Sequence, residues 1–237
     1  MTGKRLSGNS LQIDRHTPSL REKTTQALRD AILQLHFKPG QRLVERQLCV
    51  ETGVSRTCIR ESLRLLEAEG LVDRAGTKGV FVATISPEEA QQIYEVRGAL
   101  EPECARLFVA RASDREIEEL GRALARIEKA LSRKPVSDYV EALDAFYDVL
   151  LRGARNEVAR SMLRTLRARM NYLRARTAQV AEIGRKLETL ELLRGIHEAA
   201  VKRDAETLAR RCRDFVRRSA DYAAAVIGEQ PAARAAG

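Results

Sequence analysis

Hydrophobic residues recur at helical spacing over most of the chain, and the first such stretch follows Ser19. The apolar positions that share one face of this stretch are Leu20, Ala27, Ala31 and Leu35. Their spacing predicts a helix that begins near Ser19. Pro39-Gly40 then breaks the pattern. The segment LVERQLCVETG predicts a short second helix that ends at Gly53.

The third helical stretch, VSRTCIRESLRLLEAEG, has two unlike faces. Ser55 is the expected N-cap, and Gly70 is the expected end. Three arginines spaced by four residues share one side, namely Arg56, Arg60 and Arg64. The apolar residues on the opposite side are Ile59, Leu63 and Leu66. In isolation, this row of guanidinium groups would be interpreted as an ordinary solvated face.

The segment that follows changes this interpretation. LVDRAGTKGVFVAT contains two β-rich pieces around AGTKG, which is typical of a β-hairpin. Helix, short helix, helix and hairpin in this order predict a winged helix-turn-helix. In that fold the second helix of the helix-turn-helix enters the major groove of DNA, and the wing reaches the backbone or the minor groove. The arginine row is therefore a candidate for DNA recognition.

Beyond TISPEEA the pattern is helical only. Pro87 suits the first turn of a helix. We expect breaks near Ser113-Asp114, Lys134-Pro135, Gly153–Asn156, Ala181–Gly184 and Arg203-Asp204. About six helices result, which predicts a bundle. The fold class is thus mainly α, with an N-terminal winged helix-turn-helix and a C-terminal all-helical bundle. We expect a flexible arm at 1–17, a DNA-binding domain at 18–84, a helical domain at 87–228 and a flexible tail at 229–237.

Composition narrows the function classes. The 237 residues include 42 lysines and arginines against 33 aspartates and glutamates, a net charge of +9, which is compatible with phosphate binding. Four cysteines form no CxxC pair, so free thiols in a reducing cytoplasm are expected. Neither a signal peptide nor an apolar run of membrane-spanning length is apparent, and no membrane partner is expected.

Arginine suits both tasks of a recognition helix, because it grips phosphates and pairs bidentately with guanine. Ser55 and Thr57 lie at the helix start, where hydroxyls and free N–H groups can meet a phosphate. Lys78 and Gly79 lie in the expected wing, where a glycine permits close approach of the backbone.

The segment GQRLVERQLCVETGVSRTCIRESLRLLEAEGLVDRAGTKGVFV closely resembles the winged helix of the GntR superfamily. The resemblance covers about residues 20–84. It implies a DNA-contacting set of Arg46, Ser55, Arg56, Thr57, Arg60 and Gly79. Two positions depart from the family pattern: Cys58 replaces a proline, and Cys49 replaces an alanine.

Residues 87–228 resemble the FCD effector domain of FadR-type GntR regulators, beginning with IYEVRGALEPECARLFVARA. Many FCD domains hold a divalent metal with one aspartate and three histidines. The corresponding positions here are Leu143, Tyr147, Leu193 and Phe215. Leucine and phenylalanine cannot ligate a metal, so the resemblance implies a domain without a metal or other cofactor. A shifted site built from Asp144, Asp148 and His197 remains an alternative.

Without a metal, a carboxylate effector needs another partner. Arg97 is the first candidate, although a structural pair with Glu101 at spacing four is an equal alternative. Further candidates share one mid-bundle helix, namely Arg167, Arg169, Asn171 and Arg174. The apolar quartet would form the wall of a pocket suited to a larger or more hydrophobic effector.

Three function classes follow. The first is an effector-responsive transcription factor, expected to be a dimeric repressor that binds a short inverted-repeat operator in double-stranded DNA. The second is an enzyme, which the lack of a nucleophile–base constellation and of a glycine-rich phosphate loop argues against. The third is a DNA-binding protein without an effector, which the long second domain argues against mildly.

Overall fold

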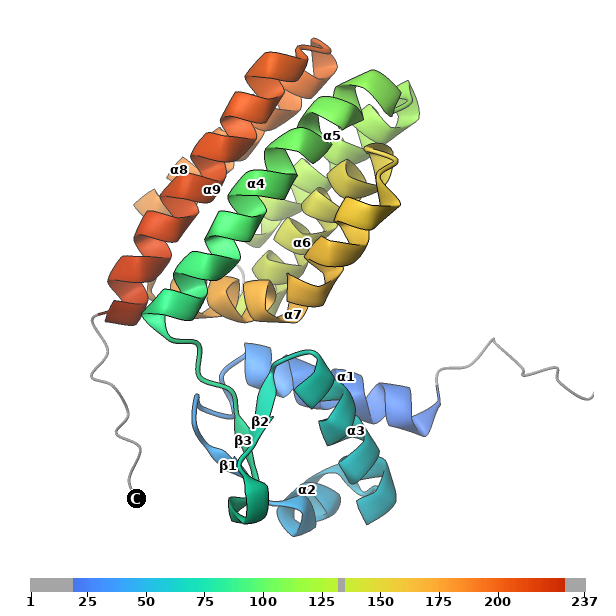
Figure 1. Cartoon of the computed structure of the whole chain (residues 1–237), viewed down its shortest axis with the longest axis vertical. Helices are drawn as coiled ribbons and strands as arrows, with labels where there is room; N and C mark the ends of the chain where they lie inside the picture. The colour runs from blue at the N-terminus through green and yellow to red at the C-terminus, as the bar shows by residue number, and fades with distance from the viewer. Residues whose placement is uncertain (1–18, 132–134, 229–237) are drawn as a thin grey trace, which may run out of the picture.

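The computed structural model describes residues 19–131 and 135–228. The arm expected at 1–17 and the tail expected at 229–237 lie outside the described residues. A small N-terminal part packs against one end of a larger helical part (Figure 1). Within the described ranges, no helix combines the length and the apolar character that crossing a membrane requires.

The N-terminal part confirms the predicted order of helix, short helix, helix and hairpin. Its elements are α1 (Leu20–Leu33), β1 (Arg42–Leu43), α2 (Glu45–Thr52), α3 (Arg56–Ala68), β2 (Val72–Arg74), the 3₁₀ turn η1 (Gly76–Lys78) and β3 (Val80–Val82). Gly53 ends α2 in the left-handed conformation, with φ of 70°, which a glycine adopts without steric cost. The winged helix-turn-helix is therefore present as predicted.

The face of α1 that carries the four apolar residues is only partly buried, with Ala31 and Leu35 packed against the core. Leu20 and Ala27 are exposed, whereas the buried residues are Thr24, Thr25, Leu28, Ile32 and Leu33. The two threonine hydroxyls donate to the carbonyls four residues earlier, which satisfies their polar groups inside the fold. This face wins because it brings Leu28 and Ile32, both larger than alanine, into the core.

One strand was missed. β1 lies where the break after Pro39-Gly40 and the start of the short second helix were predicted, and it pairs antiparallel with β3 through Arg42 opposite Phe81. The sheet has the order β1-β3-β2 and is antiparallel throughout. A strand of two residues is too short to show an alternating pattern, so the sequence could not reveal it.

The C-terminal part confirms the six predicted helices. They are α4 (Pro87–Arg111), α5 (Asp114–Ala130), α6 (Val136–Gly153), α7 (Glu157–Val180), α8 (Ile183–Val201) and α9 (Ala205–Gly228). α4 and α9 lie side by side along their length (Figure 1). Leu120, Phe146 and Leu193 are fully buried among the residues of one continuous apolar core.

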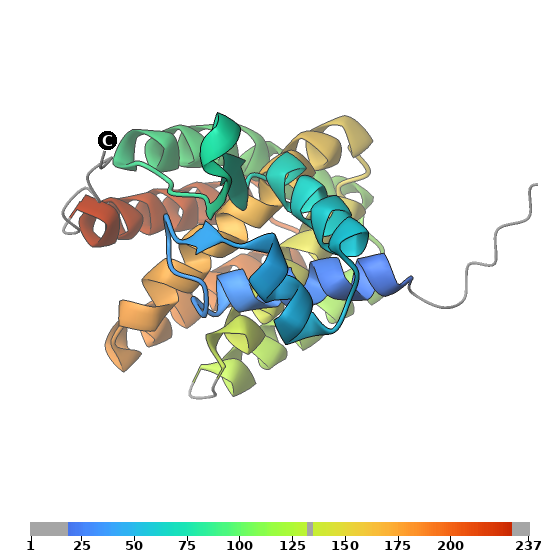
Figure 2. The ribbon, with the colours of Figure 1, turned by 90° about the horizontal axis from the view of Figure 1, so that it is seen from below.

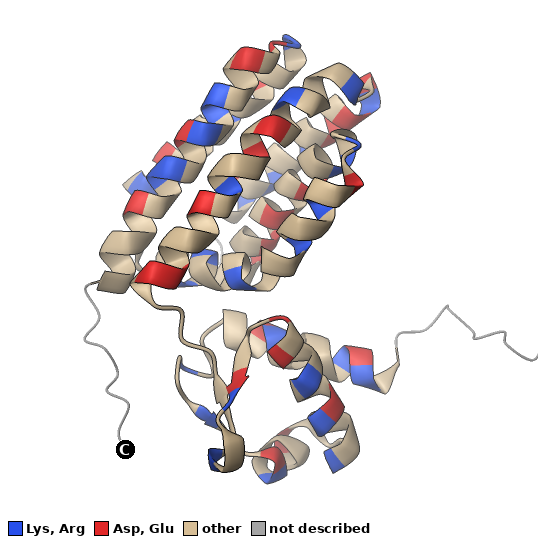
Figure 3. Cartoon of the chain, in the orientation of Figure 1, with Lys and Arg blue, Asp and Glu red and all other residues tan. Residues whose placement is uncertain are grey.

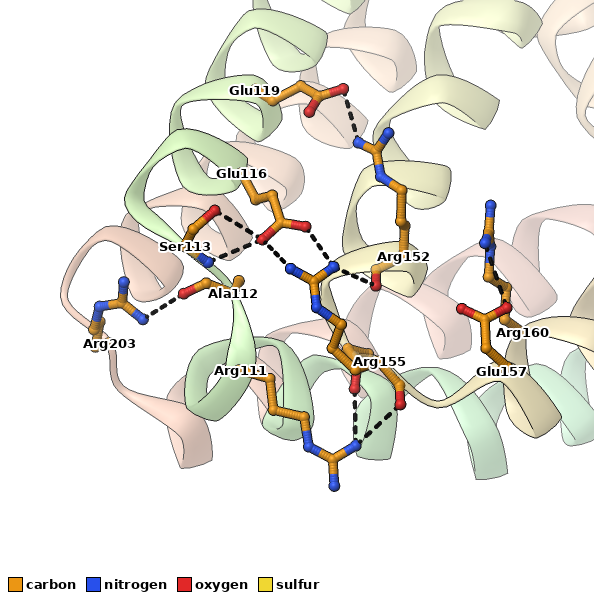
Figure 4. Close-up of polar contacts among 11 residues, drawn as sticks. Arg111, Ala112, Ser113, Glu116, Glu119, Arg152, Arg155, Glu157, Arg160 and Arg203 are labelled. Atoms are coloured by element: carbon orange, nitrogen blue, oxygen red, sulfur yellow. Dashed lines mark hydrogen bonds and ion pairs between the residues drawn. The ribbon is translucent and has the colours of Figure 1, made fainter.

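Arginines join the helix ends at the far end of the bundle (Figure 4). Arg155 donates to both carboxylate oxygens of Glu116, at 2.8 and 2.9 Å, and Glu116 also accepts from the backbone N–H of Ser113. Arg111 donates to two carbonyls just beyond α6, and Arg203 donates to two carbonyls at the end of α4. These bonds satisfy carbonyls that a helix end leaves without an intrahelical partner.

α7 belongs to the bundle and packs against the N-terminal part. Seen from the side of the winged helix, the N-terminal part covers this end of the bundle (Figure 2). Tyr172 of α7 is buried within the core of the N-terminal part. Arg169, on the same helix, lies against Gly70 just after α3, where a Cβ would stand only 2.3 Å from the arginine Nε. The C-terminal end of α3 is therefore in contact with a side chain of the bundle.

Candidate nucleic-acid interface and effector cavity

The N-terminal cap and the apolar face of α3 determine which of its side chains reach solvent. The Ser55 hydroxyl accepts a hydrogen bond from the backbone N–H of Cys58 at 3.3 Å, as the capping prediction required. Ile59, Leu63 and Leu66 are all completely buried. Arg56, Arg60 and Arg64 are consequently exposed on the outer face of α3.

The arginines of this face differ in their partners. Arg60 Nε donates to Glu45 Oε2 of α2 at 2.7 Å, although the arginine side chain is still 62% exposed. Within the described residues, Arg56 and Arg46 form no ion pair, and both are exposed. Figure 3 shows basic residues along α2 and α3, in the part of the molecule remote from the bundle, and the arginines among them are exposed. Three of them, namely Arg46, Arg56 and Arg64, form no ion pair within the described residues and keep their donors for an outside anion.

Thr57 and Cys58 occupy the first turn of α3. Thr57 is exposed beside Ser55. Cys58 is half-buried, and its thiol donates to the Thr24 hydroxyl of α1 at 3.5 Å. The cysteine that replaces the family's proline therefore contacts α1 and leaves the neighbouring polar side chains free.

The wing brings together two predicted residues and one that was missed. Lys78 is exposed in η1, and Gly79 follows with φ of 112°, a value that disfavours any side chain. A Cβ at Gly79 would stand 3.2 Å from Nε of Arg42. Arg42 is exposed on β1, so it adds a second cation to the wing. Only the pairing of β1 with β3 places it there.

Arg97 is engaged within the bundle. Its Nε and Nη2 donate to the two carboxylate oxygens of Glu101 at 2.7 and 3.2 Å, and both side chains are almost completely buried. Burial by itself would lower the pKa of Arg97, but the adjacent Glu101 carboxylate outweighs burial and raises it. Of the two alternatives for Arg97, the structure shows the pair with Glu101.

The four positions that align with the metal ligands are core. Leu143, Tyr147, Leu193 and Phe215 are each at most 4% exposed. The rings of Tyr147 and Phe215 lie 5.7 Å apart. Leu143 and Phe215 border a cavity between α4, α6, α7, α8 and α9, which Leu193 does not line. Burial raises the pKa of Tyr147 well above its usual value, and Glu101 raises it further, so its hydroxyl stays protonated.

The residues of the shifted metal site are held by other partners. Asp144 forms ion pairs with Arg167 and Arg174 of α7. His197 packs instead against Gly121 of α5. Among the residues that the structure describes, no three histidine, cysteine, aspartate or glutamate side chains gather closely enough to hold a metal ion. Asp144, Asp148 and His197 are therefore not brought together as such a group in the described structure.

Arg174 is the cation that the sequence did not single out from its neighbours. It is 7% exposed, and its guanidinium lies 5.1 Å from the centre of the Tyr147 ring. Nη1 donates to Asn171 Oδ1 at 3.0 Å, whereas Nη2 has no hydrogen-bond partner in the described structure. Burial lowers the pKa of Arg174, and the nearby Arg97 lowers it further. Tertiary packing, which helical spacing does not reveal, distinguishes Arg174 from the other arginines of α7.

Comparison with protein families gives two matches. Residues 92–218 match the FCD domain, and residues 20–82 match the family of bacterial regulatory proteins called gntR. These two ranges cover the helical bundle and the winged helix just described.

Several regulators are similar in sequence. The Nta operon transcriptional regulator of Aminobacter aminovorans is 32% identical over 140 residues, which are 59% of this chain and 66% of the relative. The HTH-type transcriptional repressor RspR of Escherichia coli is 26% identical over 158 residues, 67% of this chain and 69% of the relative. The HTH-type transcriptional regulator YdhC of Bacillus subtilis is 28% identical over 167 residues, 70% and 74% of the two chains.

Two solved structures share the fold at low identity. E. coli McbR/YncC aligns with a TM-score of 0.73 and 19% identity, covering 85% of this chain and 95% of that one. A putative GntR regulator from Rhodococcus sp. RHA1 aligns with a TM-score of 0.72 and 21% identity, covering 89% and 99%. Both alignments span the winged helix and the bundle together.

Proposed function

The chain belongs to the gntR family of bacterial regulatory proteins that carry an FCD domain, and on this premise we propose that it is an operator-specific repressor controlled by a small organic acid. DNA-binding transcriptional regulation follows from the family itself. The similar sequences are named as transcriptional regulators rather than as enzymes. Operator specificity, repression and control by an effector are the parts that we propose.

The observation that carries the proposal is the exposed arginine face of α3. Its guanidinium groups project away from a fully buried apolar stripe, and Arg56 has no ion pair within the described residues. We expect Arg56 and Arg60 to read base edges in the major groove, because arginine pairs bidentately with guanine O6 and N7. Before DNA binds, the pair with Glu45 already limits the conformational freedom of the Arg60 side chain, which lowers the entropy that binding costs.

The remaining contacts of the proposed interface are to the backbone. Ser55 and Thr57 offer hydroxyls at the start of α3, and Arg46 offers a cation from α2. In the wing, Lys78 and the close backbone approach at Gly79 act together with Arg42. Contacts of this kind fix the register of the protein on DNA, while the base contacts supply sequence specificity.

Effector control is supported by the position of α7. This helix carries Arg174 into the bundle cavity and Tyr172 into the core of the winged helix. A ligand that binds better to one arrangement of α7 would shift the population of winged-helix orientations. A tenfold change in operator affinity needs only about 1.4 kcal/mol of such differential binding.

Dimerisation and repression complete the proposal. A single winged helix reads too few base pairs for genomic specificity, whereas two related by a twofold axis read an inverted repeat. The 26%-identical relative RspR is named a repressor, which supports the sign of regulation. We therefore expect a cytoplasmic homodimer that leaves its operator when the effector binds.

Selection from a random duplex library with the full chain tests operator binding. We expect the recovered fragments to share a short inverted repeat, bound with an affinity that falls steeply as salt rises. Light scattering should give twice the mass of one chain for the free protein, and the mass of two chains plus the DNA for the complex with a recovered fragment. Fragments without a common sequence, or a monomeric mass in both samples, would contradict the proposal.

A further inference from the structure

The cavity that Leu143 and Phe215 border is basic. Four of its lining side chains are cationic, namely Arg97, Arg174, Arg185 and Lys186, and no aspartate or glutamate lines it. Lining hydroxyls come from Tyr139, Thr177, Thr189 and Ser219, among others. A lining with four cations and no carboxylate of its own favours an anionic ligand over a cationic one.

The deep cations of this cavity are not equally available. Arg97 is neutralised by the bidentate Glu101, and Arg185 donates to Glu188 at 2.8 Å. Arg174 lies only within 3.7 Å of Asp144, which is beyond hydrogen-bond distance, and Asp144 is also paired with Arg167. Among the buried cations of this cavity, Arg174 is therefore the one that can still donate to a ligand.

The geometry of Arg174 points to the same conclusion. Its side chain is 8% exposed, and Nη2 has no partner among the described residues. Leaving a donor of a buried charged group without a hydrogen bond costs free energy. A ligand whose acceptor reaches Nη2 removes this cost, which favours its binding. Arg174 also borders a second cavity, but that one is lined by Glu101, Asp144 and Asp148 as well as by four arginines, so its own carboxylates already compete for the cations that line it.

The shape of the cavity limits the ligand. Its volume is about 50 Å³, and one water needs roughly 10–15 Å³ on this scale. A space of this size suits a ligand of a few non-hydrogen atoms better than a long acyl chain. A planar carboxylate matches the guanidinium fork, and Leu143 and Phe215 offer an apolar wall for a short hydrocarbon end.

We propose that this cavity binds a short monocarboxylate and that the guanidinium of Arg174 is its direct ligand. The inference rests on the proposed function and deepens it by naming the class of effector and the residue that binds it. It replaces Arg97 by Arg174 as the carboxylate partner, and it replaces a large hydrophobic effector by a small one.

Isothermal titration calorimetry of the full chain with acetate, propanoate, lactate and pyruvate tests the proposal. We expect at least one of these acids to bind at millimolar concentration or below, and propanamide, a neutral analogue of propanoate, to bind more weakly than the acids. Arg174→Gln should lose about tenfold or more of the affinity, because the charge-assisted bond is lost. Arg164→Gln is the matched control, since Arg164 is exposed on the same helix and outside this cavity.

A second variant protects against misfolding of Arg174→Gln. Ser219 is half-buried and lines the cavity, so Ser219→Leu should narrow the space and abolish binding without lowering the melting temperature. The proposal is overturned if no acid binds the wild type, if propanamide binds as well as propanoate, or if Ser219→Leu and a folded Arg174→Gln bind normally. Operator binding measured without acid is independent of these outcomes, so loss of acid binding alone leaves the DNA-binding function standing.

Discussion

At the scale of single residues, Arg97 and Arg174 show how burial gives the same side chain different roles. Arg97 has Glu101 one helical turn away, and the two close a buried bidentate pair. Arg174 has Met170 and Ala178 at the corresponding positions. The spacing of Arg97 and Glu101 already offered their pairing as an alternative. Nothing in the spacing separates Arg174 from the other arginines of α7, because its isolation arises from packing between helices.

The Arg97–Glu101 pair predicts a sign for a double-mutant cycle. Glu101→Leu leaves a buried guanidinium without its partner, and Arg97→Met leaves a buried carboxylate, so each should destabilise the fold by about 3–5 kcal/mol. The double variant should be more stable than either single variant, because no buried charge is left alone. Urea unfolding of the four proteins measures this. Additive losses would show that the two side chains do not depend on each other.

At the scale of elements, the sequence was sufficient to predict the ends of helices, but it was not sufficient to predict the short strand β1. Ser55 caps α3 and Gly53 ends α2, since short polar side chains and glycine have local reasons to occupy those positions. The buried face of α1 does not follow from its apolar residues alone, because Thr24 and Thr25 satisfy their hydroxyls on the helix itself and can face the core. β1 depends wholly on its neighbour β3, and no local signal marks it.

At the joint where Glu116 near the start of α5 contacts Arg155 just after α6, we predict a pH dependence of stability. Burial would raise the pKa of Glu116, but hydrogen bonds from Ser113 and Arg155 outweigh it and hold the pKa below the ordinary value of 4.5. A lowered pKa in the folded state means that this group stabilises the fold above pH 4.5. That contribution is lost as the pH falls through the folded-state pKa.

Melting temperatures of the wild type and Glu116→Gln between pH 7 and pH 3 test this dependence. The wild type should be the more stable at neutral pH, and the difference between the two should shrink toward acid. Asp114, exposed in the same turn, offers Asp114→Asn as a control for a general charge effect. An unchanged difference over the whole range would show that the Glu116 charge contributes nothing at this joint.

The position of Arg169 on α7 leads us to predict a variant that binds the effector normally but in which the effector changes operator affinity less. Arg169 contacts Gly70 at the end of α3 and pairs with Glu89 at 3.3 Å, yet it lies outside the cavity of Arg174. Arg169→Ala should therefore bind the effector with wild-type affinity while the effector changes operator affinity less. Calorimetry and operator titration with and without ligand measure the two quantities. A variant that responds fully to ligand would exclude Arg169 from the connection.

At the scale of the whole molecule, the chain joins a reader of DNA to a bundle with a basic cavity. The order of elements and the six helices of the bundle follow from hydrophobic periodicity and from breaks at glycine, proline and serine. Tyr172 could not have been predicted as part of the winged-helix core, because it belongs to a helix about a hundred residues later in the chain. Long-range packing of this kind also determines which arginines meet solvent, a carboxylate or a cavity.

The central claim is that the exposed face of α3 reads DNA, and a gel-shift titration of Arg56→Ala on the selected operator tests it most directly. Arg56 is exposed and has no ion pair in the described structure, so the variant should fold normally and lose about 1–3 kcal/mol of operator binding. Arg115→Ala, which removes an exposed arginine of α5, should bind like the wild type. Wild-type affinity of Arg56→Ala for the operator, with unchanged discrimination against random DNA, would contradict the claim.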